Sequence, residues 1–213
     1  MDTKLITLYV IIGVTLLKAV SHTYPTTGTN STVALHTTLT NKSMELYQMI
    51  REGISKLNNT HRVHIPCQAD DNYSSHQSNG CVLCRPNATF NRTQIIGSEL
   101  RQMDLYNLEQ FTNQMEIVHS HEVNFSGSQT NSLVDEFERI CNNSNRVVSY
   151  IQSNILHGAT TLSPPNATCG APSLVTNNCG DTQFDCLTWW VLRGMEELVL
   201  TLANEMSGGQ WFV

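Results

Sequence analysis

Apolar residues recur every three or four positions in four stretches of the chain, and each such stretch predicts an amphipathic α-helix. The stretches cover about residues 43–57, 93–118, 132–156 and 184–206. The third is the most regular, and its stripe consists of Leu133, Phe137, Ile140, Ser144, Val148, Ile151 and Ile155. We expect Ser43 to cap the first helix and Gly208-Gly209 to end the last.

The links between the predicted helices differ in length, and link length constrains helix direction. The second and third helices are joined by a short link and should be antiparallel neighbours. The other two links, of roughly 35 and 27 residues, can run the length of a bundle and make the joined helices parallel. The sequence therefore predicts an all-α, long-chain four-helix bundle with up-up-down-down topology and two long crossover loops.

The N-terminus has the pattern of a secretory signal peptide. Lys4 precedes an uncharged, largely apolar run from Leu5 to Leu17, and Ala19-Val20-Ser21 offers small residues for cleavage. That run is too short to cross a bilayer core of about 30 Å as a helix. We expect a secreted protein in which residues 1–21 are the signal peptide, although an uncleaved signal anchor is the alternative.

Composition suggests how the remaining chain is divided. Residues 22–42 are rich in Thr and Ser and predict a flexible N-terminal leader. We expect residues 43–206 to form the helical domain and residues 207–213 a C-terminal tail. The formal net charge of -6 argues against nucleic-acid binding, which needs clustered basic residues. No later stretch is long and apolar enough for membrane insertion.

Nine Asn-x-Ser/Thr sequons predict a glycosylated surface if the chain is secreted. Their asparagines are Asn30, Asn41, Asn58, Asn72, Asn87, Asn91, Asn124, Asn142 and Asn166. A glycan must face water, so each sequon that is used marks an exposed position.

Seven cysteines should be mostly paired in an oxidising compartment, and the odd count leaves one over. Cys141 lies within the third predicted helix and is the candidate for a buried free thiol. Cys81-Val82-Leu83-Cys84 has the spacing of a redox motif or half a zinc site, but structural disulfides to different partners are the simpler interpretation. Of the histidines, His61, His64, His119 and His121 are interpreted as solvated loop residues, with no metal site and no cofactor.

Several segments, in order, resemble the leukaemia inhibitory factor-like cytokines of the interleukin-6 family. The first-helix segment Gln48–Asn58 and the loop segment Leu83–Phe90, with its Leu-Cys-Arg-Pro-Asn-Ala-Thr pattern, are the longest. Asn142-Asn143-Ser144 occupies the place of a sequon in that family's third helix. Ser153–Leu156 is similar to the end of the same helix, and Leu202-Ala203-Asn204 to the end of the last.

This resemblance implies a disulfide from the loop cysteine Cys84 to Cys186 in the last helix. The family's two bridges from the leader have no cysteines here. The simplest pairings of the remaining loop cysteines are then Cys67 with Cys81 and Cys169 with Cys179.

The resemblance also implies a function, which is to crosslink class I cytokine receptor chains and activate JAK/STAT signalling. The chains would be the shared interleukin-6-family signal-transducing chain and one like the leukaemia inhibitory factor receptor. Residues assigned to receptor binding are Phe184, Trp189, Gln48, Arg51, Glu52, Ser55, Glu136 and Arg139. The family's Phe-x-x-Lys motif becomes Phe184-Asp185-Cys186-Leu187 here, with leucine in place of lysine.

Two other interpretations stay open. One is a glycan-shielded secreted decoy or envelope-type glycoprotein that binds without signalling. The other is a different four-helix hormone, against which the Leu-Cys-Arg-Pro-Asn segment argues. The sequence carries no Gly-rich phosphate loop and no nucleophile elbow, so we do not expect an enzyme. We expect the protein to act as a monomer.

Overall fold

A computed structural model describes residues 30–60, 97–125, 132–156, 180–208 and 211. The chain divides into two compact units, Met1–Ala34 and Leu35–Val213. Of the first unit only the start of a helix is described, so the fold below concerns residues from Leu35 onward.

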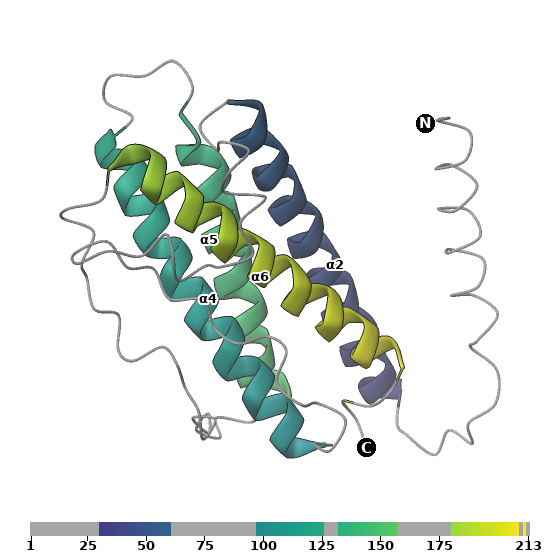
Figure 1. Ribbon diagram of the computed structural model, residues 1–213. Coiled ribbons are helices and arrows are strands. Elements are labelled where there is room, and N and C mark those ends of the chain that lie inside the picture. The colour runs from purple at the N-terminus through teal and green to yellow at the C-terminus, as the bar shows by residue number, and fades with distance from the viewer. Residues whose placement is uncertain (1–29, 61–96, 126–131, 157–179, 209–210, 212–213) are drawn as a thin grey trace, which may run out of the picture. The chain divides into compact units, whose positions relative to one another are not determined.

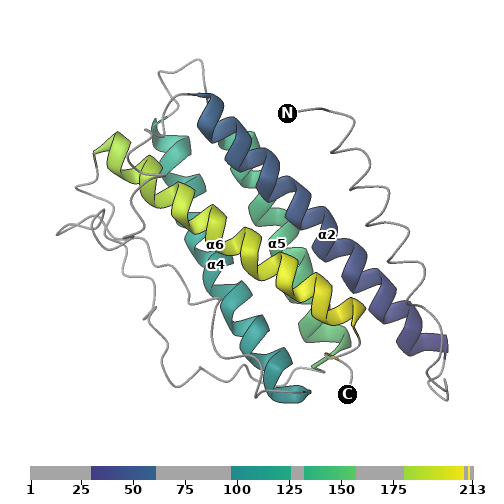
Figure 2. The same ribbon diagram turned by 45° about the vertical axis from the view of Figure 1, so that its right-hand side comes forward.

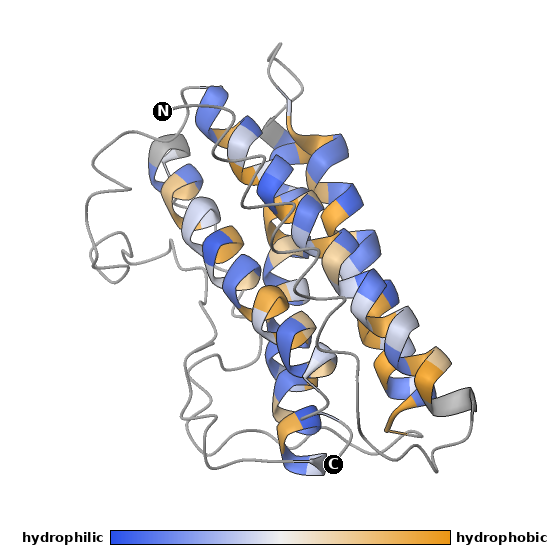
Figure 3. Cartoon of the chain, turned by 90° about the vertical axis from the view of Figure 1, so that its right-hand side faces the viewer, coloured by the Kyte–Doolittle hydropathy of each residue, from blue (hydrophilic) through white to orange (hydrophobic). Residues whose placement is uncertain are grey.

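The described residues form four α-helices and no strand. They are α2 (Asn30–Asn59), α4 (Ser98–Phe125), α5 (Val134–Asn154) and α6 (Asp181–Ser207), which lie side by side in Figures 1 and 2. Each helix carries both hydrophobic and hydrophilic residues in Figure 3, as an amphipathic helix should. The predicted all-α class with four helices is confirmed.

The bounds of α5 and α6 agree closely with the predicted ones. α5 lies within the predicted 132–156, and six of its seven predicted stripe residues are buried, while Ile155 is partly buried. α6 begins three residues before the predicted start and ends directly before Gly208, whose N–H donates to the Asn204 carbonyl at 2.9 Å. Here the regular spacing of apolar residues is enough to place both helices.

The first helix starts much earlier than predicted. α2 begins at Asn30, so residues 30–42 are helical, although we assigned them to a flexible leader. Ser43, predicted as the cap, lies inside the helix with a completely buried side chain. The stripe of buried residues already includes Leu39, four positions before Ser43. Because Ser43 and nearby threonines interrupt the apolar pattern, the sequence did not predict that the helix extends before Ser43.

α4 is shifted toward the C-terminus relative to the prediction of 93–118. Gly97 immediately before it has a φ of 63°, a left-handed conformation that interrupts a right-handed helix and favours glycine. At the other end α4 continues to Phe125. His119 and His121 therefore lie in the last turns of α4, and their assignment to a solvated loop is wrong.

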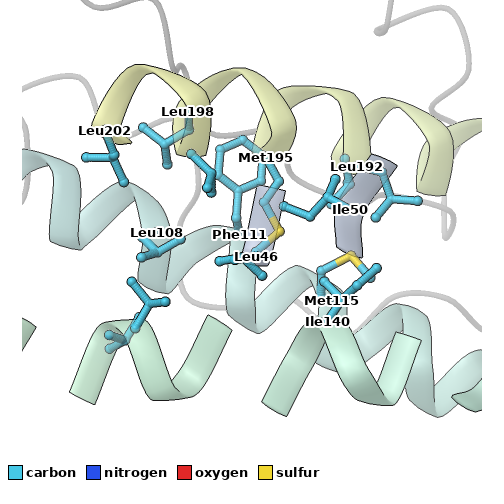
Figure 4. Close-up of a cluster of buried hydrophobic side chains, with 14 of the residues drawn as sticks. Leu46, Ile50, Leu108, Phe111, Met115, Ile140, Leu192, Met195, Leu198 and Leu202 are labelled. Carbon is cyan, nitrogen blue, oxygen red and sulfur yellow. The ribbon is translucent and has the colours of Figure 1, made fainter. Parts of the chain in front are cut away.

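The core is built from all four helices. Figure 4 shows ten labelled side chains converging in one cluster: Leu46 and Ile50 of α2, Leu108, Phe111 and Met115 of α4, Ile140 of α5, and Leu192, Met195, Leu198 and Leu202 of α6. Gly53 allows α2 to approach α5 closely, since a Cβ there would lie 2.9 Å from the Ile140 Cδ1 atom. Close packing of α2 against α5 therefore explains why a glycine stands at position 53 inside a helix.

Contacts between helices fix their relative directions pair by pair. From α2 to α5, Lys42 lies over the Tyr150 ring, and Glu52 pairs with Arg139. The α5 partner moves back along the chain as the α2 residue moves forward, so α2 and α5 run antiparallel. From α2 to α6, Ser43 contacts Met206 and Arg51 pairs with Glu196, which makes this pair antiparallel as well.

α4 is antiparallel to the same two helices. Its contacts with α5 include the pairs Glu109 with Gln152 and Glu116 with Asn145. Toward α6 and the segment after it, His121 stacks on Phe184, and Asp104 accepts a hydrogen bond from Trp211.

Candidate functional site

The predicted partner-binding residues of the first helix lie together on the outer face of α2. Gln48, Arg51, Glu52 and Ser55 are all exposed, and they alternate with the buried stripe that faces the core. Because exposed polar residues on a rigid helix are available to a partner without rearrangement, this face remains a candidate binding surface.

A row of ion pairs joins α2 to α5 at the edge of this face. Arg139 lies 3.7 Å from Glu52 across the helices and 3.3 Å from Glu136 on its own helix. Lys56 of α2 pairs with Glu136. We call Glu52, Lys56, Glu136 and Arg139 the α2–α5 seam. Three of the four were predicted. Lys56 was missed, although its place four residues after Glu52 is a recognisable charge pattern.

A second charged row joins α2 to α6. Arg51 lies 3.6 Å from Glu196, which also pairs with Arg193 one turn earlier on α6. The Arg193 guanidinium lies 5.9 Å from the centre of the Trp189 ring, which is partly buried and packs against the core. We call Arg51, Arg193 and Glu196 the α2–α6 seam. Predicted residues Arg51 and Trp189 are thereby connected through the same surface of α6.

Phe184 is buried, contrary to its expected place as a surface anchor. Its side chain is 2% exposed and stacks on His121, with the ring centres 3.6 Å apart and the planes 15° from parallel. The ring holds the start of α6 against the end of α4. A buried ring cannot fill a partner's pocket unless this segment moves, so the position does not support Phe184 as a receptor anchor.

Two cysteines lie within the described residues. Cys186 is disulfide-bonded, and its partner lies outside the described residues, so the predicted pairing with Cys84 stays a prediction. Cys141 is a free, buried thiol. Burial first, and the nearby carboxylates of Glu116 and Glu138, raise the pKa of Cys141 to about 12. The thiol is therefore protonated at neutral pH, and it has the properties of a packing residue rather than a nucleophile.

Side chains of four sequon asparagines are described. Asn41, Asn124 and Asn142 are exposed, and Asn58 is partly exposed near the end of α2. Asn30 begins α2, and its side chain, like the other four sites Asn72, Asn87, Asn91 and Asn166, lies outside the described part of the chain. The predicted disulfide residues Cys67, Cys81, Cys169 and Cys179 lie outside it as well.

Trp211, which the sequence predicts to lie in a C-terminal tail, packs against α4. Its side chain is completely buried. Its indole N–H donates to the Asp104 carboxylate at 2.8 Å, and its carbonyl accepts a hydrogen bond from Arg101. A tryptophan that follows a Gly-Gly pair was the available signal, since large aromatic residues are commonly buried.

The described residues contain no group of three His, Cys, Asp or Glu side chains arranged to bind a metal ion. Nor does any described helix combine the length and apolarity that a membrane span requires. Comparisons with models of protein families, with curated proteins and with solved structures find no match to this chain.

Proposed function

We propose that the protein is a secreted helical cytokine that crosslinks two class I cytokine receptor chains and activates JAK/STAT signalling. The resemblance of its segments to the interleukin-6 family suggests the class. The observation that carries the proposal is the set of helix directions.

α2 and α4 each run antiparallel to both α5 and α6. These four relations support the proposed up-up-down-down bundle, in which the first two helices would be parallel and so would the last two. Such a bundle needs a long connection between α2 and α4 and another between α5 and α6, which is the arrangement of helical cytokines. The 8 residues between Phe125 and Val134 fit a short link between antiparallel neighbours.

Secretion is supported by two further observations. Cys186 is disulfide-bonded, and disulfides form and persist in oxidising compartments. The described asparagines of the sequons are exposed or partly exposed, as glycan carriers must be. Both agree with the signal-peptide pattern of residues 1–21.

We assign the face formed by Gln48, Glu52 and Ser55, together with the α2–α5 seam, to the shared signalling chain. Its side chains are polar, and Gln48, Glu52 and Ser55 are exposed. The second receptor chain would contact α6 near Trp189, whose ring lies beside Arg193. Of the two aromatic residues assigned to receptor binding, Phe184 is buried, and Trp189 is the better candidate for an anchor. Tryptophan and arginine are among the residues that most often dominate binding energy.

A charge-swap experiment tests the proposal at the α2–α5 seam. Glu52→Arg and Arg139→Glu are made singly and together, and the purified proteins are applied to cells that carry both receptor chains and a STAT-driven reporter. The double variant restores an ion pair between the helices but reverses the charges that a partner meets. We expect all three variants to keep the wild-type helix content and to lose reporter activity.

Three outcomes are informative. Full activity of the double variant would show that the α2–α5 seam does not contact the receptor. No activity of the wild-type protein on any such cell would contradict the cytokine function. Binding of wild-type protein to a receptor ectodomain without receptor dimerisation would favour the secreted decoy.

A further inference from the structure

Two serines occupy core positions that the helical pattern would give to apolar residues. Ser43 of α2 and Ser144 of α5 are both completely buried. Within the described residues, Ser43 is the single fully buried polar residue of α2, and Ser144 is that of α5. The hydroxyl oxygen of Thr40, a partly buried residue of α2, is buried as well. Burying a hydroxyl costs free energy that alanine would avoid, so each serine needs a reason.

Hydrogen bonding explains the burial of Ser43 poorly and the burial of Ser144 only in part. The Ser43 hydroxyl lies 4.0 Å from the Met206 sulfur, which is a poor hydrogen-bond acceptor. The Ser144 hydroxyl bonds to the hydroxyl of Thr112, but Thr112 also bonds to the Leu108 carbonyl of its own helix. Thr112 would thus keep a partner if residue 144 were alanine.

What the two serines share is their place in a sequon. Ser43 completes Asn41-Lys42-Ser43, and Ser144 completes Asn142-Asn143-Ser144. Residues two apart in an α-helix point in directions about 200° apart. Each asparagine is accordingly exposed, while its serine faces the core.

This geometry separates the two groups that N-glycosylation needs together. The reaction joins the asparagine amide nitrogen to the anomeric carbon of a lipid-linked oligosaccharide. The bond from that carbon to the lipid pyrophosphate breaks, the pyrophosphate leaves with the electron pair, and the nitrogen gives up one proton. The enzyme recognises the hydroxyl two residues on, which is why the sequon contains Ser or Thr. In the folded helix that hydroxyl is inaccessible.

We propose that Asn41 and Asn142 are N-glycosylated, that both acquire their glycans before the bundle folds, and that Ser43 and Ser144 are in the core because the sequon requires them. The proposal rests on the secretion proposed above. Asn58 provides the contrast: its sequon ends at Thr60, which follows α2 and donates its hydroxyl to the Leu57 carbonyl at 2.7 Å. That hydroxyl lies at a helix end and not in the centre of a helix.

The first test translates the full chain into microsomes and maps occupied sequons by mass spectrometry. Ser43→Ala should remove the glycan at Asn41 alone, and Ser144→Ala the glycan at Asn142 alone. Ser43→Thr and Ser144→Thr, which keep the hydroxyl, should retain both. Absence of glycan at Asn41 and Asn142 in the wild-type chain, with other sequons occupied, would overturn the proposal and leave secretion intact. Absence of every glycan, together with an uncleaved signal peptide, would overturn both.

The second test addresses the order of events. Full-length protein made without glycans is offered to purified oligosaccharyltransferase and lipid-linked oligosaccharide, either folded or reduced, alkylated and confirmed as unfolded by circular dichroism. We expect Asn41 and Asn142 to be modified in the unfolded chain and not in the folded one. Equal modification of both forms would show that the buried serines impose no order.

Discussion

α4 and α2 differ in where their polar contacts with neighbouring helices lie. Besides an exposed contact of Glu116 with Asn145, α4 makes buried contacts, in which Thr112 meets Ser144 and the Glu122 carboxylate accepts the Leu133 N–H at 2.9 Å. α2 uses ion pairs at the surface, such as Glu52 with Arg139, both more than 45% exposed. Five of the nine buried polar or charged residues in the described part of the chain belong to α4, and one belongs to α2.

Buried polar contacts of α4 contribute to the stability of the fold, whereas the exposed ion pairs of α2 are available to a binding partner. A buried polar group that loses its partner pays the full cost of desolvation, so contacts of this kind fix how α4 meets α5. An exposed ion pair is compensated by water and contributes little when broken. The outer face of α2 can therefore exchange its ion pairs for contacts with a partner, whereas the buried polar contacts of α4 cannot be exchanged without a loss of stability.

Trp211→Ala should have the largest effect, because it empties a completely buried site and removes the donor to Asp104. We expect a loss of about 3–5 kcal/mol in the free energy of unfolding, measured by urea denaturation. Trp189→Ala is the matched control on a partly buried ring and should cost less. An equal loss for the two variants would contradict the assigned core role of Trp211.

Glu122→Ala should rank second. Its carboxylate is 2% exposed and satisfies the buried Leu133 N–H at the start of α5, so its removal should cost about 1–3 kcal/mol. Hydrogen exchange should also accelerate in the first turn of α5. Glu116→Ala, on an exposed residue of the same helix, should stay within about 0.5 kcal/mol of wild type.

Thr112→Val should cost about 1 kcal/mol, since it leaves the Ser144 hydroxyl buried without this partner. Adding Ser144→Ala should restore most of the lost stability, because two apolar groups can replace two paired polar ones. Thermal or urea unfolding of the two single variants and the double variant measures this directly. A double variant with the sum of both losses would show that the hydroxyl pair contributes to stability in its own right.

The smallest effect is expected at the α2–α5 seam. A double-mutant cycle with Glu52→Ala and Arg139→Ala should give a coupling of about 0.2–1 kcal/mol. Repeating the cycle at 1 M NaCl should reduce it further, because salt screens exposed charges. A salt-independent coupling above that range would remove the contrast with α4.

The same contrast explains how much the sequence could predict. α5 has only one buried polar residue, and its apolar spacing predicted the helix to within two residues at each end. It also predicted most of the core residues, although buried Val147 was missed. α4 buries the polar residues Asp104, Asn107, Gln114 and Glu122, which a hydrophobic pattern counts as exposed. The predicted bounds of α4 were wrong at both ends. The sequence predicted the part of α2 after Ser43, where the stripe is apolar. It did not predict the part before Ser43, because this serine interrupts the stripe.

Two individual residues were placed wrongly for a related reason. Phe184 and Trp211 are buried by partners distant in the chain, His121 and Asp104, and a local pattern does not contain such partners. The exposed polar face of α2 was easier to assign, because exposure on a regular helix follows from spacing alone.

Ser43 and Ser144 also differ in how far along the chain each lies from the residue that its hydroxyl contacts. Thr112 is synthesised 32 residues before Ser144, whereas Met206 is synthesised 163 residues after Ser43. At translation speeds of 5–20 residues per second, Ser43 waits about 8–33 s for Met206 to be made. Under the proposed order of events, the acceptor at Asn41 stays open throughout that interval, while the acceptor at Asn142 closes as soon as α5 docks on α4. Slower translation should therefore leave Asn41 fully modified and make Asn142 the variable site.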